Sequence, residues 1–226
     1  MNRSKGLGVA LATVLIGGGA LALAGFALAT ASPHQAALQC VKSTTQAHAC
    51  SFTISTFPDS EEGVHGKNGG PHPDWVTYSN DNIDVPAHTT VYVTIDQYDS
   101  GGAANNPYFD NVVGTRGGFD TVNGKQTTKV GADDIGHTFT LHGIPGNGKY
   151  LFISVPLPVN NATKTPLKIG DGEYAKPVVV KFSFTTGGAT VYNWNCEFPC
   201  GGSREGNGFG EAMSSYGYMS GTITVE

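Results

Sequence analysis

The chain has 226 residues, of which 14% are charged, and its 13 basic and 18 acidic side chains give a net charge of −5. This length suits one large or elaborated domain. Lys and Arg do not cluster beyond the N-terminus, which argues against a nucleic-acid-binding surface. The 32 glycines and 12 prolines interrupt short runs rich in Val, Thr, Tyr and Phe. This pattern predicts an all-β protein.

The first 32 residues have the character of a targeting or anchoring segment. Arg3 and Lys5 precede an uncharged apolar run over residues 7–31, which as a helix rising about 1.5 Å per residue could cross a bilayer. The positive flank predicts that the rest of the chain is delivered to the extracytoplasmic side. Small-x-small patterns at residues 27–29 and 29–31 also fit signal-peptide cleavage. Membrane anchoring and secretion therefore both stay open.

Two cysteines lie ten residues apart just after this segment. Because exported proteins meet an oxidising environment, Cys40 and Cys50 are expected to form a disulfide that fixes the start of the domain.

Strand-like alternation recurs along the rest of the chain. Expected strands cover residues 51–57, 75–79, 89–95, 119–122, 126–130, 137–141, 150–155, 178–184, 190–194 and 221–225. Asn123-Gly124 predicts a tight hairpin turn, and residues 156–176 are expected to form a long surface loop. With no helical periodicity beyond the N-terminus, the pattern predicts a Greek-key β-sandwich preceded by one transmembrane or signal helix. We expect residues 1–32 as signal anchor or signal peptide, 33–74 as an extension with a first strand, and 75–226 as the sandwich.

Side chains suited to a soft metal ion gather in the C-terminal half. They are His137, Cys196, Cys200, Met213 and Met219. Thiolate and thioether sulfur favour Cu(I), whereas imidazole also holds Cu(II), so a site of this composition could exchange one electron.

The order of His, Cys loop, Met and a last Gly-x-x-x-Val strand resembles the cupredoxin family over residues 75–226. The spacing Cys196-x-x-x-Cys200 resembles the dinuclear-copper loop of cytochrome c oxidase subunit II. The resemblance implies a membrane-tethered, extracytoplasmic domain that binds one or two copper ions through His137, both cysteines and Met213 or Met219. It implies single-electron transfer with a redox protein or an oxidase complex, as a carrier or accessory subunit rather than a catalyst.

The sequence departs from both copper patterns at the second histidine. The subunit II pattern places His at position 204 and Met at 207, where this chain has Arg204 and Asn207. No histidine follows His142 in the sequence, so the blue-copper pattern also lacks its second imidazole.

Copper-free interpretations stay open beside the metal site. Cys196 and Cys200 could form a disulfide, which would make the chain a cupredoxin-fold accessory or interaction module. A Cu(I) delivery protein is a further alternative. His137 could be a hydrogen-bonded strand residue, and the methionines could fill the core. If His137 binds metal, Asp133 or Asp134 could orient its second ring nitrogen. Trp194 is expected in the core.

Overall fold

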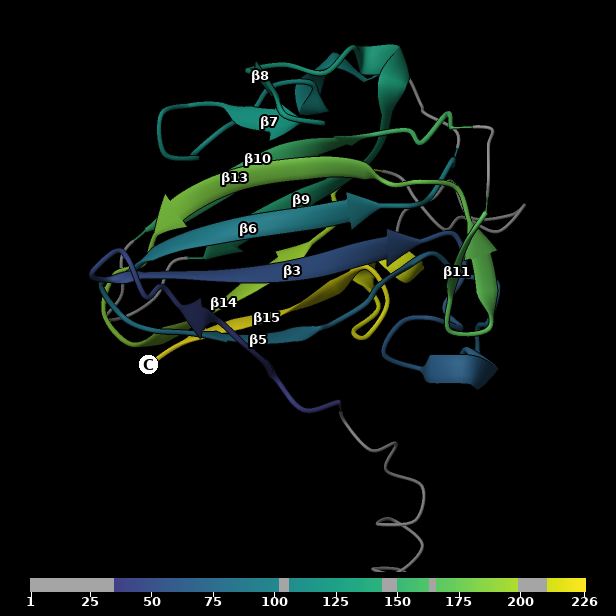
Figure 1. Cartoon of the computed structure of the whole chain (residues 1–226), viewed down its shortest axis with the longest axis horizontal. Helices are drawn as coiled ribbons and strands as arrows, with labels where there is room; N and C mark the ends of the chain where they lie inside the picture. The colour runs from purple at the N-terminus through teal and green to yellow at the C-terminus, as the bar shows by residue number, and fades with distance from the viewer. Residues whose placement is uncertain (1–34, 102–105, 144–149, 163–165, 199–210) are drawn as a thin grey trace, which may run out of the picture. The chain divides into compact units, whose positions relative to one another are not determined.

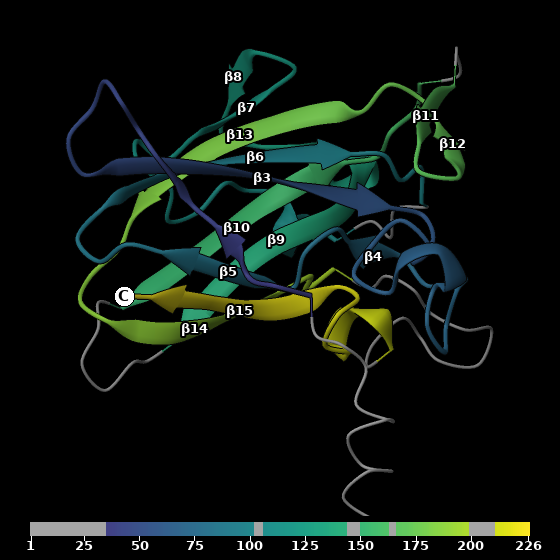
Figure 2. The same cartoon turned by 60° about the horizontal axis from the view of Figure 1, so that its bottom comes forward.

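Two β-sheets are stacked face to face in the unit Gln35–Glu226. The computed structural model describes residues 35–101, 106–143, 150–162, 166–198 and 211–226. Figure 1 shows the stacked strands, and Figure 2, turned by 60°, separates the two layers. The described residues therefore confirm the predicted all-β class and the sandwich arrangement.

The first sheet has six strands and carries the C-terminus. In spatial order they are β1 (Leu38–Gln39), β5 (Asn82–Val85), β15 (Ser220–Val225), β14 (Thr190–Asn195), β9 (Ile135–Gly143) and β10 (Leu151–Pro158). The β1–β5 and β5–β15 pairs are parallel, and the other pairs are antiparallel. The sheet is thus mixed, and β9 lies between β14 and β10.

The second sheet is also mixed. Its strands in spatial order are β2 (Val41–Lys42), β3 (Ala49–Phe57), β6 (Thr90–Gln97), β13 (Val178–Thr185), β7 (Asp120–Val122) and β8 (Lys125–Thr127), and β4 (Thr77–Tyr78) pairs with β3. Only the β3–β6 pair on this path is parallel. Because β3 pairs with β6 along eight positions, the first long strand among the described residues is built into the sandwich.

Short helical turns and one small hairpin complete the described residues. The 3-10 turns are η1 (Gly66–Asn68), η2 (Pro107–Phe109), η3 (Ala132–Asp134) and η4 (Ala212–Ser214), and the hairpin is β11 (Leu167–Ile169) with β12 (Gly172–Tyr174). None of the described helices is long and apolar enough to cross a membrane. The predicted N-terminal helix, residues 1–32, lies outside the described residues.

Alternating side chains build the core between the sheets. In β6, residues 91, 93 and 95 are buried apolar positions, and in β15 residues 223 and 225 are buried while their neighbours are partly exposed. This period of two is what a strand with one buried face requires. Trp194 is fully buried among Tyr78 and Phe139, at ring-centroid distances of 4.8 and 5.3 Å, so it is a core residue as expected.

Two local predictions are confirmed and one is wrong. Cys40 and Cys50 form a disulfide. Asn123 and Gly124 both have positive φ, 50° and 82°, in the turn between β7 and β8, as a tight hairpin requires. The prediction of a long loop over residues 156–176 is wrong, because β10 continues to Pro158 and β11 and β12 form a hairpin beyond it. The prolines of β10 and the short length of β11 and β12 concealed these strands in the sequence.

Candidate metal centre

His137 lies on β9, inside the first sheet, with a side chain that is 2% exposed. The strand is buried at every position from Ile135 to Leu141. A histidine in such a place must satisfy both ring nitrogens within the protein. Its partners therefore define the site.

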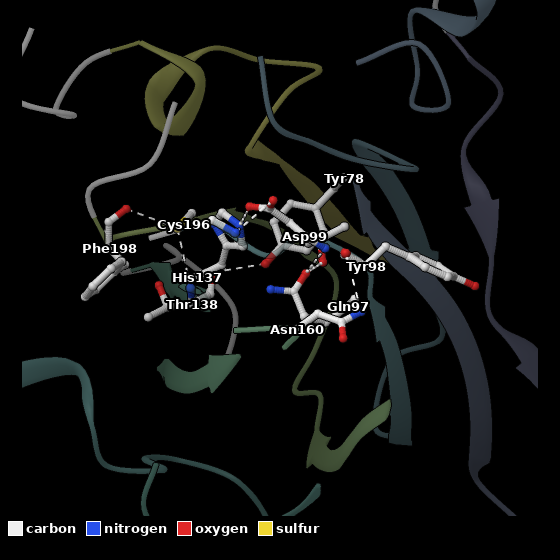
Figure 3. A network of polar contacts seen from close by, with 11 residues as sticks. Tyr78, Gln97, Tyr98, Asp99, His137, Thr138, Asn160, Cys196 and Phe198 are labelled. Carbon is white, nitrogen blue, oxygen red and sulfur yellow. Dashed lines mark hydrogen bonds and ion pairs between the residues drawn. The ribbon is translucent and has the colours of Figure 1, made fainter. Parts of the chain in front are cut away.

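Asp99 is the partner of one ring nitrogen. The Nε2 atom of His137 lies 2.6 Å from Oδ2 of Asp99, and the two side chains are both buried. Asp99 comes just after β6, in the opposite sheet, so the pair joins the two layers of the sandwich (Figure 3).

Cys196 faces the other ring nitrogen. Its sulfur lies 3.9 Å from Nδ1 of His137. The backbone N–H of Thr138 donates to the sulfur at 3.4 Å, and the carbonyl oxygen of Phe198 lies 3.2 Å from it. Cys196 directly follows β14, which pairs with β9, so the antiparallel register brings the two side chains together. Figure 3 shows the resulting row of Asp99, His137 and Cys196.

Met219 is placed next to Cys196 by the pairing of the last two strands. The backbone N–H of Cys196 donates to the carbonyl oxygen of Met219 at 2.8 Å, and both side chains are fully buried in the core. Met213 lies in η4 and packs, partly buried, against the same core. Cys200 lies outside the described residues, so its predicted roles in a metal site or a disulfide stay predictions.

The electrostatics of the pair favour a charged His137. Burial alone would lower the pKa of this imidazole, but hydrogen bonding to Asp99 and Cys196 outweighs burial and raises the pKa to about 9. The pKa of Asp99 is lowered: burial opposes this, but the hydrogen bond and charge of His137 and the N–H groups of Gly101 and Ser100 outweigh it. The metal-free protein therefore holds a proton at Nδ1 at neutral pH, which a metal ion would have to displace.

The donor atoms fit two ligands of one copper ion. Metal bonds to imidazole nitrogen and thiolate sulfur measure about 2.0 and about 2.3 Å. The 3.9 Å between Nδ1 and Sγ is shorter than their sum, so one ion could contact both atoms. Asp99 on the outer nitrogen is the arrangement typical of a metal-binding histidine. Within the described part of the chain, however, no three His, Cys, Asp or Glu residues group as metal ligands, so the methionines or Cys200 would have to complete such a site.

The prediction that Asp133 or Asp134 orients His137 is wrong. Asp133 and Asp134 lie in η3, where the backbone of Asp134 bonds to Gly131 and Val159. The orienting carboxylate belongs to Asp99, 38 positions before His137. The sequence held a weak local signal for it, because an Asp two residues before a Gly is typical of a side-chain-closed turn. That signal says nothing about which histidine the carboxylate meets.

His142 lies on the same strand but serves a different surface. Its side chain is 45% exposed, and its Nε2 atom lies 3.0 Å from Oδ1 of Asn195 and 3.7 Å from Oε1 of Glu197. It therefore offers a natural comparison residue for His137.

Solved structures with a distant likeness to the chain include the following three. Auracyanin B is 15% identical, with a TM-score of 0.31 over 83% of this chain and 94% of its own. Rusticyanin from Thiobacillus ferrooxidans is 15% identical, with a TM-score of 0.32 over 80% and 84%. A laccase from Pediococcus acidilactici is 11% identical, with a TM-score of 0.37 over 86% of this chain and 30% of its own. No family model matches the sequence, and neither does any curated protein. At these scores the likeness assigns neither a family nor a ligand to the chain.

Proposed function

We propose that this chain is a cupredoxin-like copper protein that carries single electrons outside the cytoplasm. The observation that supports this most is the buried pair of donor atoms, Nδ1 of His137 and Sγ of Cys196, 3.9 Å apart. It joins the two residues that the sequence pattern singled out, although they lie 59 positions apart in the chain. A nitrogen and a sulfur donor in one buried place suit copper better than hard cations such as Mg²⁺ or Ca²⁺.

The protein's own residues would hold and shield the ion. His137 and Cys196 would bind it, and Met219, adjacent to Cys196 across the strand pair, is the favoured third ligand. Met213 and Cys200 are the remaining candidates. When bound, copper supplies reversible one-electron exchange. The buried position of His137 and Cys196 would exclude water, and the N–H of Thr138 would stabilise negative charge on the sulfur.

The disulfide Cys40–Cys50 supports an extracytoplasmic location, because disulfides persist in oxidising compartments. Residues 1–32 would tether the domain to the membrane, or would be cleaved to release it. A redox protein or an oxidase complex would then be the electron partner. The relation to cytochrome c oxidase subunit II, and with it a second copper ion, depends on Cys200 acting as a ligand.

The first test is copper content and visible absorption of the full chain in detergent, with thiols counted before and after mild reduction. We expect bound copper and an intense thiolate-to-Cu(II) band, both lost in Cys196→Ser and in His137→Ala. His142→Ala is the matched control and should keep both, because His142 lies on the same strand but outside the pair.

Other results would point elsewhere. Uptake of Cu(I) without a coloured Cu(II) form would favour copper delivery over electron transfer. No copper uptake even by the reduced protein would end the copper proposal and favour an accessory module with a Cys196–Cys200 disulfide.

A further inference from the structure

We infer that Asp99 is a positioning residue that directs the Nδ1 atom of His137 toward Cys196 and biases the site toward Cu(II) over Cu(I). The inference rests on the proposed function and deepens it. It starts from the 2.6 Å contact between Oδ2 of Asp99 and Nε2 of His137, on the side of the ring that faces away from Cys196 (Figure 3).

The carboxylate of Asp99 is itself fixed in orientation. Its second oxygen, Oδ1, accepts the backbone N–H of Gly101 at 3.0 Å, so each oxygen has a separate partner. Rotation of the carboxylate would break both contacts at once. The ring of His137 is therefore held by a group that cannot easily turn away.

The backbone of Asp99 is held as well, by the amide side chain of Gln97 and by the backbone of Asn160. The backbone N–H of Asp99 donates to Oε1 of Gln97 at 3.1 Å. The carbonyl oxygen of Asp99 accepts the N–H of Asn160 at 3.0 Å. The Nδ2 atom of Asn160 in turn donates to the carbonyl oxygens of Gln97 and Tyr98 at 3.2 and 3.4 Å.

These contacts tie the end of β6 to the segment after β10, which belongs to the other sheet. Gln97 and Asn160 are both almost fully buried. A connected buried network of this kind rigidifies the group at its centre. The network thus supports one placement of Asp99, and through it one placement of His137.

Two chemical consequences follow for the imidazole. A carboxylate acceptor at Nε2 keeps the proton on that nitrogen and leaves Nδ1 as the lone-pair donor. The negative charge also makes Nδ1 a stronger donor than a neutral acceptor would. A stronger donor and a nearby negative charge stabilise a divalent ion more than a monovalent ion.

The variant that tests this is Asp99→Asn in the full chain, because Asn keeps the shape and an acceptor oxygen while removing the charge. We expect Cu(II) affinity to fall about ten- to a hundredfold, the usual loss on removing such an outer partner. The fold-loss of Cu(I) affinity should be smaller than that of Cu(II) affinity by a factor of at least about ten. Each tenfold loss of Cu(II) affinity relative to Cu(I) affinity raises the reduction potential by about 59 mV. Asp96→Asn, three residues earlier on β6, is the matched control and should change neither affinity.

Equal losses for Cu(I) and Cu(II), or no loss of either, would overturn the inference. A second measurement covers a variant that does not fold: ¹⁵N NMR of His137 in the metal-free wild-type chain, at a pH where the spectrum shows a neutral ring. We expect the proton on Nε2 and a bare Nδ1; a proton on Nδ1 would overturn the inference. Because this spectrum needs no copper, it decides whether Nδ1 of His137 is left free of a proton even if the wild-type chain binds no copper and the proposed function fails.

Discussion

Two buried aspartates in this molecule have opposite surroundings. Asp99, after β6, shares its oxygens between His137 and the N–H of Gly101, and its pKa is lowered. Asp120, at the start of β7, is fully buried, and no other described residue donates a hydrogen bond to its carboxylate oxygens. Burial raises the pKa of Asp120 to about 7.

The difference teaches that burial alone does not mark a functional carboxylate. A buried charge is tolerated where it is paired and hydrogen-bonded, and otherwise the group takes up a proton. Asp99 stays charged because a cationic ring and backbone N–H groups surround it. Asp120 is neutral below about pH 7, and we assign it no role in the site.

The largest expected effect comes from breaking the Asp99 pair. Asp99→Ala should lower the free energy of unfolding of the metal-free chain by about 3–5 kcal/mol, because it leaves His137 buried without its counter-charge. Chemical denaturation at neutral pH measures this. A loss below about 1 kcal/mol would mean that the Asp99–His137 pair contributes little to the stability of the fold. Pairing would then not explain why Asp99 and Asp120 differ.

At Asp120, removing the charge is expected to raise the free energy of unfolding rather than lower it. Because its pKa is raised in the folded state, Asp120 costs no stability below the ordinary value of 3.8, and stability is lost as the pH rises through about 7. Asp120→Asn removes this charge and should stabilise the chain by about 1–3 kcal/mol at pH values above 7.

The pH profile separates this cause from a simple packing effect. The advantage of Asp120→Asn over the wild type should grow as the pH rises from about 4 to about 7 and then level off. Urea unfolding at several pH values measures it. An advantage that does not change with pH would show that charge is not the reason.

The same contrast shows what the sequence could and could not predict. Strand alternation, the Asn123-Gly124 turn and the cysteine pair follow from local patterns, and the structure confirms them. The choice of His137 and Cys196 came from residue type and order in the chain. Asp99 was missed because its meeting with His137 depends on how two sheets stack, which no local pattern encodes. Asp133 and Asp134 were nearer in sequence, and proximity along the chain was the wrong guide.

The smallest effect is expected in the hairpin that follows Asp120. Gly124 has a φ of 82° and open space where a side chain would stand, so Gly124→Ala should cost about 1 kcal/mol for the left-handed backbone alone. This cost comes from the backbone conformation and involves no titratable group. It should therefore be the same at pH 5 and at pH 8, unlike the effect of Asp120→Asn in the neighbouring strand. Unfolding curves of both variants at these two pH values make the comparison. A pH-dependent cost for Gly124→Ala would show that the hairpin controls the burial of Asp120, and that its raised pKa reflects how tightly the turn closes.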